Sequence, residues 1–65
     1  MFEKLNSWYT IQRGGVYKIV FVNSVSDKGY NVKDKSGQID FITFNDLANN
    51  IVEIVERKEK GILLD

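Results

Sequence analysis

One stretch of the chain dominates its hydrophobic pattern. Residues 16–25 (VYKIVFVNSV) are dense in the β-branched and aromatic side chains that suit a pleated strand. Both faces of such a strand are apolar. They hold Tyr17, Ile19 and Phe21 on one side and Val16, Val20 and Val22 on the other. The pattern predicts a central strand covered on both faces, because the sheet curls into a barrel or because a partner packs against it.

The next apolar segment alternates strictly with polar positions. Residues 27–29 (DKG) predict a turn in which the glycine is free to take positive φ, and residues 30–33 (YNVK) then follow as a strand. Its alternation places Tyr30 and Val32 inward and Asn31 and Lys33 outward. A second turn with a left-handed glycine at its end is predicted at residues 34–37 (DKSG), which makes this segment the first arm of a hairpin.

Residues 38–44 (QIDFITF) form the returning arm of that hairpin. Its buried face is expected to hold Ile39, Phe41 and Thr43. Alternation then points Asp40 outward, and Phe44 is expected to fold over an end of the core.

The remaining segments are short. Residues 45–50 (NDLANN) open with Asn45 as an N-cap and predict a single helical turn. Residues 51–56 resume β-branched alternation as a final strand. At the other end, we expect a helical or irregular lead-in over residues 1–6, followed by a first strand that turns at residues 13–15 (RGG) into the central one.

These elements predict a mainly β architecture of about five antiparallel strands, with one short helical turn before the last. Residues 1–65 make a single domain, which ends in a mixed-charge tail over residues 57–65 that closes on an apolar patch. A sheet this small has to curl on itself to bury both faces of its central strand, so we expect a small barrel.

The order of features from Tyr17 to Glu56 resembles that of a known group of proteins. Residues 30–34 (YNVKD), Gly37 and residues 41–44 (FITF) carry the resemblance, together with Asp46-Leu47 and residues 51–55 (IVEIV). The pattern is similar to that of the small SH3-like proteins of phages of Gram-positive bacteria and of their hosts. The resemblance implies an SH3-like barrel. The Pro-peptide groove residues of eukaryotic SH3 domains are not visible, so it implies no ligand.

The composition leaves little room for catalysis. The chain has no Cys and no His, so it lacks the usual zinc ligands, a thiol nucleophile and a base for its hydroxyl groups. Carboxylates are the remaining acid–base option, and Asp40, on the outer face of its strand, is expected to be solvated. We therefore predict no enzyme activity, no metal, no cofactor and no small-molecule substrate.

Charge and hydropathy limit the kinds of partner and the cellular location that the sequence predicts. Nine basic and nine acidic side chains cancel, which argues against a uniform electropositive field. Residues 1–35 hold an excess of basic groups and residues 36–65 an excess of acidic ones, and pairing between strands of the two halves is expected to interleave them. With no leader-like start and no apolar run of membrane-spanning length, the chain is expected to be soluble and cytoplasmic.

The leading functional hypothesis is a small protein-interaction module, such as a phage-encoded protein that binds and modulates a host protein. Apolar side chains beyond what so small a core can bury tend to mark an interface, and Trp and Tyr are frequent anchors. The expected contact residues are Trp8, Tyr9, Phe44, Ile62, Leu63 and Leu64. The alternative for these residues is structural: Trp8 caps an end of the barrel and the tail pairs within the chain.

Two further hypotheses stay open. Small barrels can stack nucleic-acid bases on exposed aromatics beside a basic groove, and aromatics alternate with lysines at Tyr17-Lys18 and over residues 30–33. A nucleic-acid site would use Arg13, Lys18, Lys28, Lys33 and Lys35. In the alternative interpretation, Tyr17 and Tyr30 are core residues and the lysines are solvated. The third hypothesis is a structural homo-oligomer sealed by edge-strand pairing or tail exchange.

Overall fold

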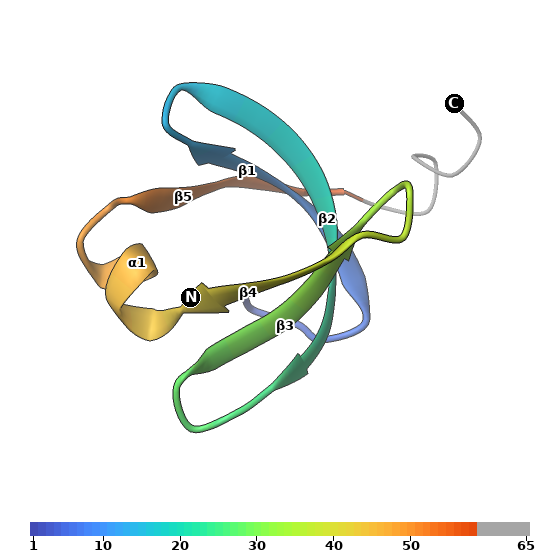
Figure 1. Ribbon diagram of the computed structural model, residues 1–65, viewed down its shortest axis with the longest axis horizontal. Helices are drawn as coiled ribbons and strands as arrows, with labels where there is room; N and C mark the ends of the chain where they lie inside the picture. The colour runs from blue at the N-terminus through green and yellow to red at the C-terminus, as the bar shows by residue number, and fades with distance from the viewer. Residues whose placement is uncertain (59–65) are drawn as a thin grey trace.

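Five antiparallel strands form one sheet in the order β4-β3-β2-β1-β5, and one short helix precedes the last strand (Figure 1). In this computed structural model, residues 1–58 are described, Lys58 by its backbone alone. The elements are β1 (Ser7–Arg13), β2 (Val16–Val25), β3 (Gly29–Asp34), β4 (Ile39–Thr43), α1 (Phe44–Ala48) and β5 (Val52–Lys58). The mainly β prediction is confirmed, and so is a short helix before the final strand.

The long strand β2 belongs to both halves of the sheet. Over Val16 to Val22 it pairs with β1, and from Val20 onward it pairs with β3. Figure 1 shows how β2 bends between these two partners, so that the sheet curls. Within the part of the chain described, the edge strands β4 and β5 are not paired with each other, so the sheet is not closed.

Pairing between the two halves of the sequence follows the prediction. Strand β1 pairs with β5, and β3 pairs with β4, so strands from the acidic half flank those from the basic half. The last strand runs further than the sequence suggested, because Arg57 and Lys58 belong to β5 while Ile51 precedes it. The rest of the expected tail, residues 59–65, lies outside the described residues.

The core lies on one face of the curled sheet. It consists of Phe2, Tyr9, Ile11, Val20, Val22, Tyr30, Val32, Ile42 and Val52. The lead-in over residues 1–6 is irregular, which is one of the two forms that the sequence predicted. It brings the Phe2 ring into contact with two aromatic rings of the core. The Phe2 ring meets Tyr9 and Tyr30 edge-on, with centroids 4.8 Å apart in both cases. Phe44 closes the same end of the core, as predicted, with its ring edge-on to Tyr30 at 5.4 Å.

Within the described residues, the sheet covers only one face of the central strand and does not close over the other face as a barrel would. Val20 and Val22 are buried, whereas Ile19 and Phe21 on the other face are only partly buried. Val16 and Tyr17 are both 64% exposed. They lie beside the β1–β2 turn, beyond the point where β3 begins to pair, so no neighbouring strand covers them on that side.

The predicted faces of β4 are reversed. Ile42 is fully buried, while Ile39 is 79% and Phe41 37% exposed, and Asp40 lies on the core side instead of pointing outward. The register explains this result. Directly opposed residues share a face of the sheet, and Ile42 and Asp40 lie opposite the inward-facing Tyr30 and Val32. The inward placement of Tyr30 and Val32 itself is confirmed.

The predicted turn at residues 13–15 is present, and of the two glycines predicted to take positive φ, Gly37 is confirmed. Gly14 and Gly15 have φ of 57° and 79°, and Gly37 has φ of 91°, all in the left-handed region. Gly29 differs, because its φ is not positive. A Cβ there would meet the Ile42 carbonyl oxygen and would lie 2.7 Å from the Thr43 Cα. Close backbone approach, not turn geometry, is the reason that position 29 needs glycine.

The helix begins at Phe44 after the N-cap Thr43, two residues earlier than an N-cap at Asn45 predicts. The Thr43 hydroxyl accepts a hydrogen bond from the Asp46 amide (3.0 Å), so Thr43 is the N-cap of α1 and Asn45 is not. Thr43 is both the last residue of β4 and the N-cap of α1, because an N-cap residue has the extended backbone of a strand.

Candidate binding surface

The side of the sheet turned away from the core carries large apolar side chains from three strands. We call this side the outer face and define its apolar set as Trp8 of β1, Tyr17, Ile19 and Phe21 of β2, and Ile39 and Phe41 of β4. None of these six belongs to the buried core. The outer face is therefore an apolar surface that this part of the chain leaves partly uncovered.

One row of the outer face crosses four strands. In the strand register Trp8 lies opposite Phe21, Phe21 opposite Lys33, and Lys33 opposite Ile39. The Trp8 and Phe21 rings are tilted by 59° with centroids 5.2 Å apart. The Lys33 ammonium lies 5.7 Å from the centre of the Phe21 ring, within the range of a cation–π interaction. These contacts hold the row as a continuous aromatic and basic ridge.

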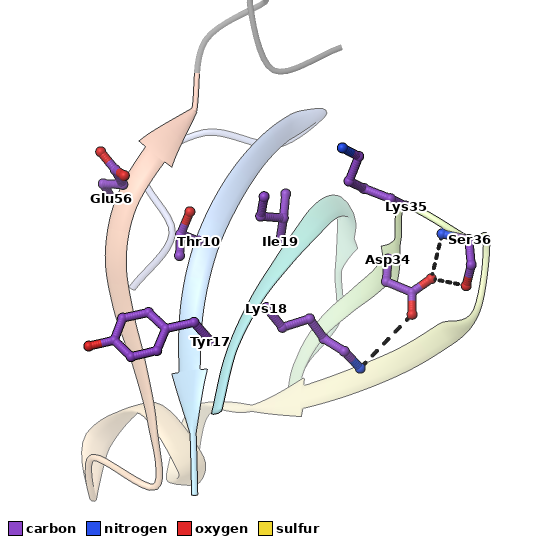
Figure 2. Close-up of a pocket in the computed structure, with 8 residues that line it drawn as sticks. All are labelled: Thr10, Tyr17, Lys18, Ile19, Asp34, Lys35, Ser36 and Glu56. Atoms are coloured by element: carbon purple, nitrogen blue, oxygen red, sulfur yellow. Dashed lines mark hydrogen bonds and ion pairs between the residues drawn. The ribbon is translucent and has the colours of Figure 1, made fainter. Parts of the chain in front are cut away.

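The next row forms a groove. Thr10 lies opposite Ile19 on one side and opposite Glu56 on the other, and Figure 2 shows Glu56, Thr10, Ile19 and Lys35 following one another across the sheet. Tyr17 forms part of the wall. The Thr10 hydroxyl is buried here and has no hydrogen-bond partner among the residues described. A buried hydroxyl without a partner is costly to the fold.

The far wall of the groove is the β3–β4 turn, which Asp34 organises. One oxygen of its carboxylate accepts hydrogen bonds from the Ser36 hydroxyl (2.6 Å) and from the backbone amides of Ser36 (2.9 Å) and Gln38 (3.0 Å). The other oxygen lies 4.0 Å from the Lys18 ammonium. The Ser36 hydroxyl, and then the Gln38 amide, lower the pKa of Asp34 below its usual value. Asp34 is thus occupied with fixing the turn.

Opposite charges flank the apolar set of the outer face. Lys33 on β3 and Lys35 just beyond it lie on one side, and we call them the basic margin. Glu53 and Glu56 of β5 lie on the other side, opposite Gln12 and Thr10 in the register, and we call them the acidic margin. All four residues are exposed. Trp8 and the β2 side chains of the apolar set lie between these charges, whereas Ile39 and Phe41 of β4 lie beyond Lys33.

The structure separates the residues expected to bind a protein. Trp8 lies on the outer face, but Tyr9 is only 2% exposed and belongs to the core, so its assignment to a surface is corrected. Its hydroxyl accepts a hydrogen bond from the Lys4 amide and donates one to the Lys4 carbonyl. Phe44 is half-buried against Tyr30. Ile62, Leu63 and Leu64 lie outside the described residues.

The structure brings some of the five expected nucleic-acid contacts together, because Lys18 and Lys35 line the groove and Arg13 and Lys18 line a second pocket with Asp40. Arg13 is paired with Asp40 at 3.0 Å, and Lys18 approaches Asp34. Lys28 lies in the turn between β2 and β3, whereas Lys33 and Lys35 lie on the outer face. Of the two tyrosines considered, Tyr30 is a core residue, but Tyr17 is exposed, which the core interpretation of Tyr17 did not foresee.

The sequence analysis recognised the two apolar faces of the central strand and a partner as one possible cover, but it did not predict which face stays uncovered. It placed Phe41 on the buried face of its strand and left open whether Tyr17 is a core residue. A strand with two apolar faces in so short a chain has one face more than a single curled sheet can cover, and the register shows that this face holds Tyr17, Ile19 and Phe21.

Residues 1–58 contain no group of three or more acidic side chains placed to hold a metal ion. The same part of the chain has no helix long and apolar enough to cross a membrane. The chain matches no protein-family model, no curated protein and no solved structure. Among the residues described, the outer face is the surface with the largest set of apolar side chains outside the core.

Proposed function

We propose that the chain is a non-catalytic protein-interaction domain of the small SH3-like type and that the outer face is its contact surface. Five antiparallel strands with a short helix before the last support the SH3-like assignment. The observation that carries the binding function is the apolar set of six side chains on the outer face, which the core does not use.

The composition of the outer face is that of a protein interface. Such interfaces are rich in aromatic side chains at their centre and polar at their rim. The outer face has Trp8, Tyr17 and Phe21 in its middle and charged side chains of both signs at its margins. A protein partner can cover the apolar centre and pair with charges at either margin.

A capture experiment with matched variants tests this function. The tagged full chain is incubated with nuclease-treated bacterial lysate, alongside the variant Tyr17→Ser/Ile39→Ser and a control, Val25→Ser/Ile51→Ser. All four side chains are exposed, but only the first two belong to the outer face. We expect a stoichiometric protein to be retained by the wild type and the control and lost with the outer-face variant. Equal retention by both variants would exclude this surface.

A second candidate function rests on the Trp8–Phe21–Lys33 row. Aromatic rings beside a cation are what single-stranded nucleic-acid sites use for base stacking and phosphate contact. It ranks second because Arg13 and Lys18 lie beside carboxylates and Glu53 and Glu56 share the outer face. A mobility shift with single-stranded DNA or RNA at low salt, lost steeply as salt rises, would favour it.

A further inference from the structure

We propose that Asp40 guards the open edge of β4 against pairing with a further strand. The inference goes beyond the proposed function, since it concerns an edge of the sheet and not the outer face. It is carried by two contacts of the Asp40 carboxylate, one with the backbone of β4 itself and one with Arg13.

The edge of β4 that faces away from β3 is the open edge. Among the residues described, β4 lies at one end of the strand order and pairs with β3 alone. Ile39 and Phe41 on this strand are exposed to different degrees but neither is buried. An accessible edge strand presents unpaired N–H and C=O groups, which are a template for pairing with another chain.

The register identifies the backbone groups that point to the open edge. The Phe44 amide donates a hydrogen bond to the Lys28 carbonyl at 3.0 Å, so these two residues form a hydrogen-bonded pair. Hydrogen-bonded and non-hydrogen-bonded pairs alternate along an antiparallel ladder. Phe41 lies three positions further along, opposite Asn31, and so belongs to a non-hydrogen-bonded pair. The N–H and C=O of Phe41 therefore point away from β3, at the middle of the open edge.

The Asp40 carboxylate occupies the amide that an added strand would use. Its Oδ1 accepts a hydrogen bond from the Phe41 amide at 2.7 Å. Its Oδ2 accepts one from Nη1 of Arg13 at 3.0 Å, which holds the carboxylate in this position. The carbonyl oxygen of an incoming strand would meet a charged acceptor there in place of a free donor. Pairing would have to displace the carboxylate from both of its partners.

The rest of the open edge is short. Strand β4 has five residues, and its last residue, Thr43, already caps α1 through its hydroxyl. An added strand thus depends on the N–H and C=O of Phe41, which lie at the centre of β4. One carboxylate at this position is enough to oppose pairing along the whole edge.

The strand that fits the unguarded edge is β4 of a second copy. A two-fold axis at Phe41 places this residue opposite itself in an antiparallel pair, where the two copies exchange their N–H···O=C hydrogen bonds. The same axis places Ile39 opposite Thr43. Removal of the Asp40 carboxylate is therefore expected to allow self-association through β4.

Hydrogen exchange of the Phe41 amide measures the guard directly, in samples that sedimentation shows to be monomeric. In the wild type we expect this amide to exchange about tenfold more slowly than that of Ile39, which points to the same edge. In Asp40→Ala this difference is expected to disappear. Asp27→Ala, which removes an exposed carboxylate from the β2–β3 turn, is the matched control. Equally fast exchange of the Phe41 amide in the wild type and in Asp40→Ala would overturn the guard.

Self-association measures the consequence. The wild type, Asp40→Ala, Asp27→Ala and Arg13→Gln are compared by sedimentation velocity from about 1 μM to about 1 mM, and we expect Asp40→Ala to associate about tenfold more tightly than the others. Arg13→Gln is expected to match the wild type, because it keeps the contact between Asp40 and the Phe41 amide. Association of Arg13→Gln as tight as that of Asp40→Ala would assign the effect to the ion pair and overturn the guard. Equal association of Asp40→Ala and Asp27→Ala would do the same.

A second variant carries the test if melting curves show that Asp40→Ala does not fold. Asp40→Asn keeps an acceptor oxygen for the Phe41 amide, but it loses the charge and offers an NH₂ donor to an incoming carbonyl. We expect it to associate more tightly than Asp27→Asn, and equal association would reject the guard. None of these variants changes the apolar set of the outer face, so the capture experiment with Tyr17→Ser/Ile39→Ser decides the proposed function separately.

Discussion

The guanidinium of Arg13 lies 3.0 Å from the carboxylate of Asp40, although the two residues belong to strands that are not neighbours in the sheet. Arg13 ends β1 and Asp40 lies in β4, with β2 and β3 between them in the strand order. The ion pair therefore crosses the inner side of the curled sheet. It joins two parts of the chain that the β ladder does not connect directly.

This ion pair is expected to contribute little to stability. Both side chains are 42% exposed, and exposed pairs typically contribute between about 0.2 and 1 kcal/mol. A double-mutant cycle with Arg13→Gln and Asp40→Asn, followed by urea unfolding, is expected to give a coupling free energy below about 1 kcal/mol that shrinks in high salt. A coupling of several kcal/mol that is insensitive to salt would show that the contact clamps the curl.

The Asp34 carboxylate is expected to make stability depend on acid pH. Its pKa is lowered from 3.8, chiefly by the Ser36 hydroxyl and next by the Gln38 amide. A group with a lowered folded pKa stabilises fully above its unfolded value, so its contribution is present above about pH 4 and is lost as pH falls through the lowered pKa. Carbon-detected NMR titration measures the midpoint directly.

The variant Ser36→Ala tests this assignment. Removal of the hydroxyl, the largest cause, is expected to raise the pKa of Asp34 toward 3.8 and to move the acid loss of stability to higher pH. Ser26→Ala is the matched control, because its hydroxyl serves the β2–β3 turn and does not contact Asp34. An unchanged Asp34 midpoint in Ser36→Ala would mean that the backbone amides and Lys18 set it without the hydroxyl.

Local sequence signals predicted the strands, the turns and the short helix, since β-branched runs and glycine turns act over few residues. They did not predict which face of β4 is buried. Residues 39–44 are apolar on both parities, so alternation could not decide, and the register against Tyr30 and Val32 did. The candidate site shared this difficulty, because Trp8, Phe21 and Lys33 meet only through pairing between three strands.

Gly29 is expected to be intolerant of any side chain. A Cβ at this position would collide with the Ile42 carbonyl and the Thr43 Cα, both backbone atoms that cannot turn aside. We expect Gly29→Ala to separate β3 from β4 and to destabilise the fold by several kcal/mol, on the order of the largest single-substitution effects. Thermal unfolding followed by circular dichroism measures the loss.

The control for Gly29→Ala is Gly14→Asn. Gly14 has positive φ, a conformation that asparagine tolerates, and a Cβ there meets nothing within 4 Å. This variant is expected to change the free energy of unfolding by less than about 1 kcal/mol. If Gly29→Ala were as stable as Gly14→Asn, the close approach of β3 and β4 would have to be wider than described.

Phe2 is expected to be essential to the fold although it lies in the irregular lead-in. Its side chain is 7% exposed and its ring meets Tyr9 and Tyr30 edge-on. Truncation of a buried Phe to Ala costs about 3–5 kcal/mol, and a domain of this length has a total stability of roughly 3–10 kcal/mol. We expect Phe2→Ala to unfold at a much lower urea concentration than the wild type, and Phe2→Leu to unfold at an intermediate one. Met1→Ala, at a side chain 62% exposed, is expected to match the wild type. A Phe2→Ala midpoint equal to that of Met1→Ala would remove the lead-in from the core.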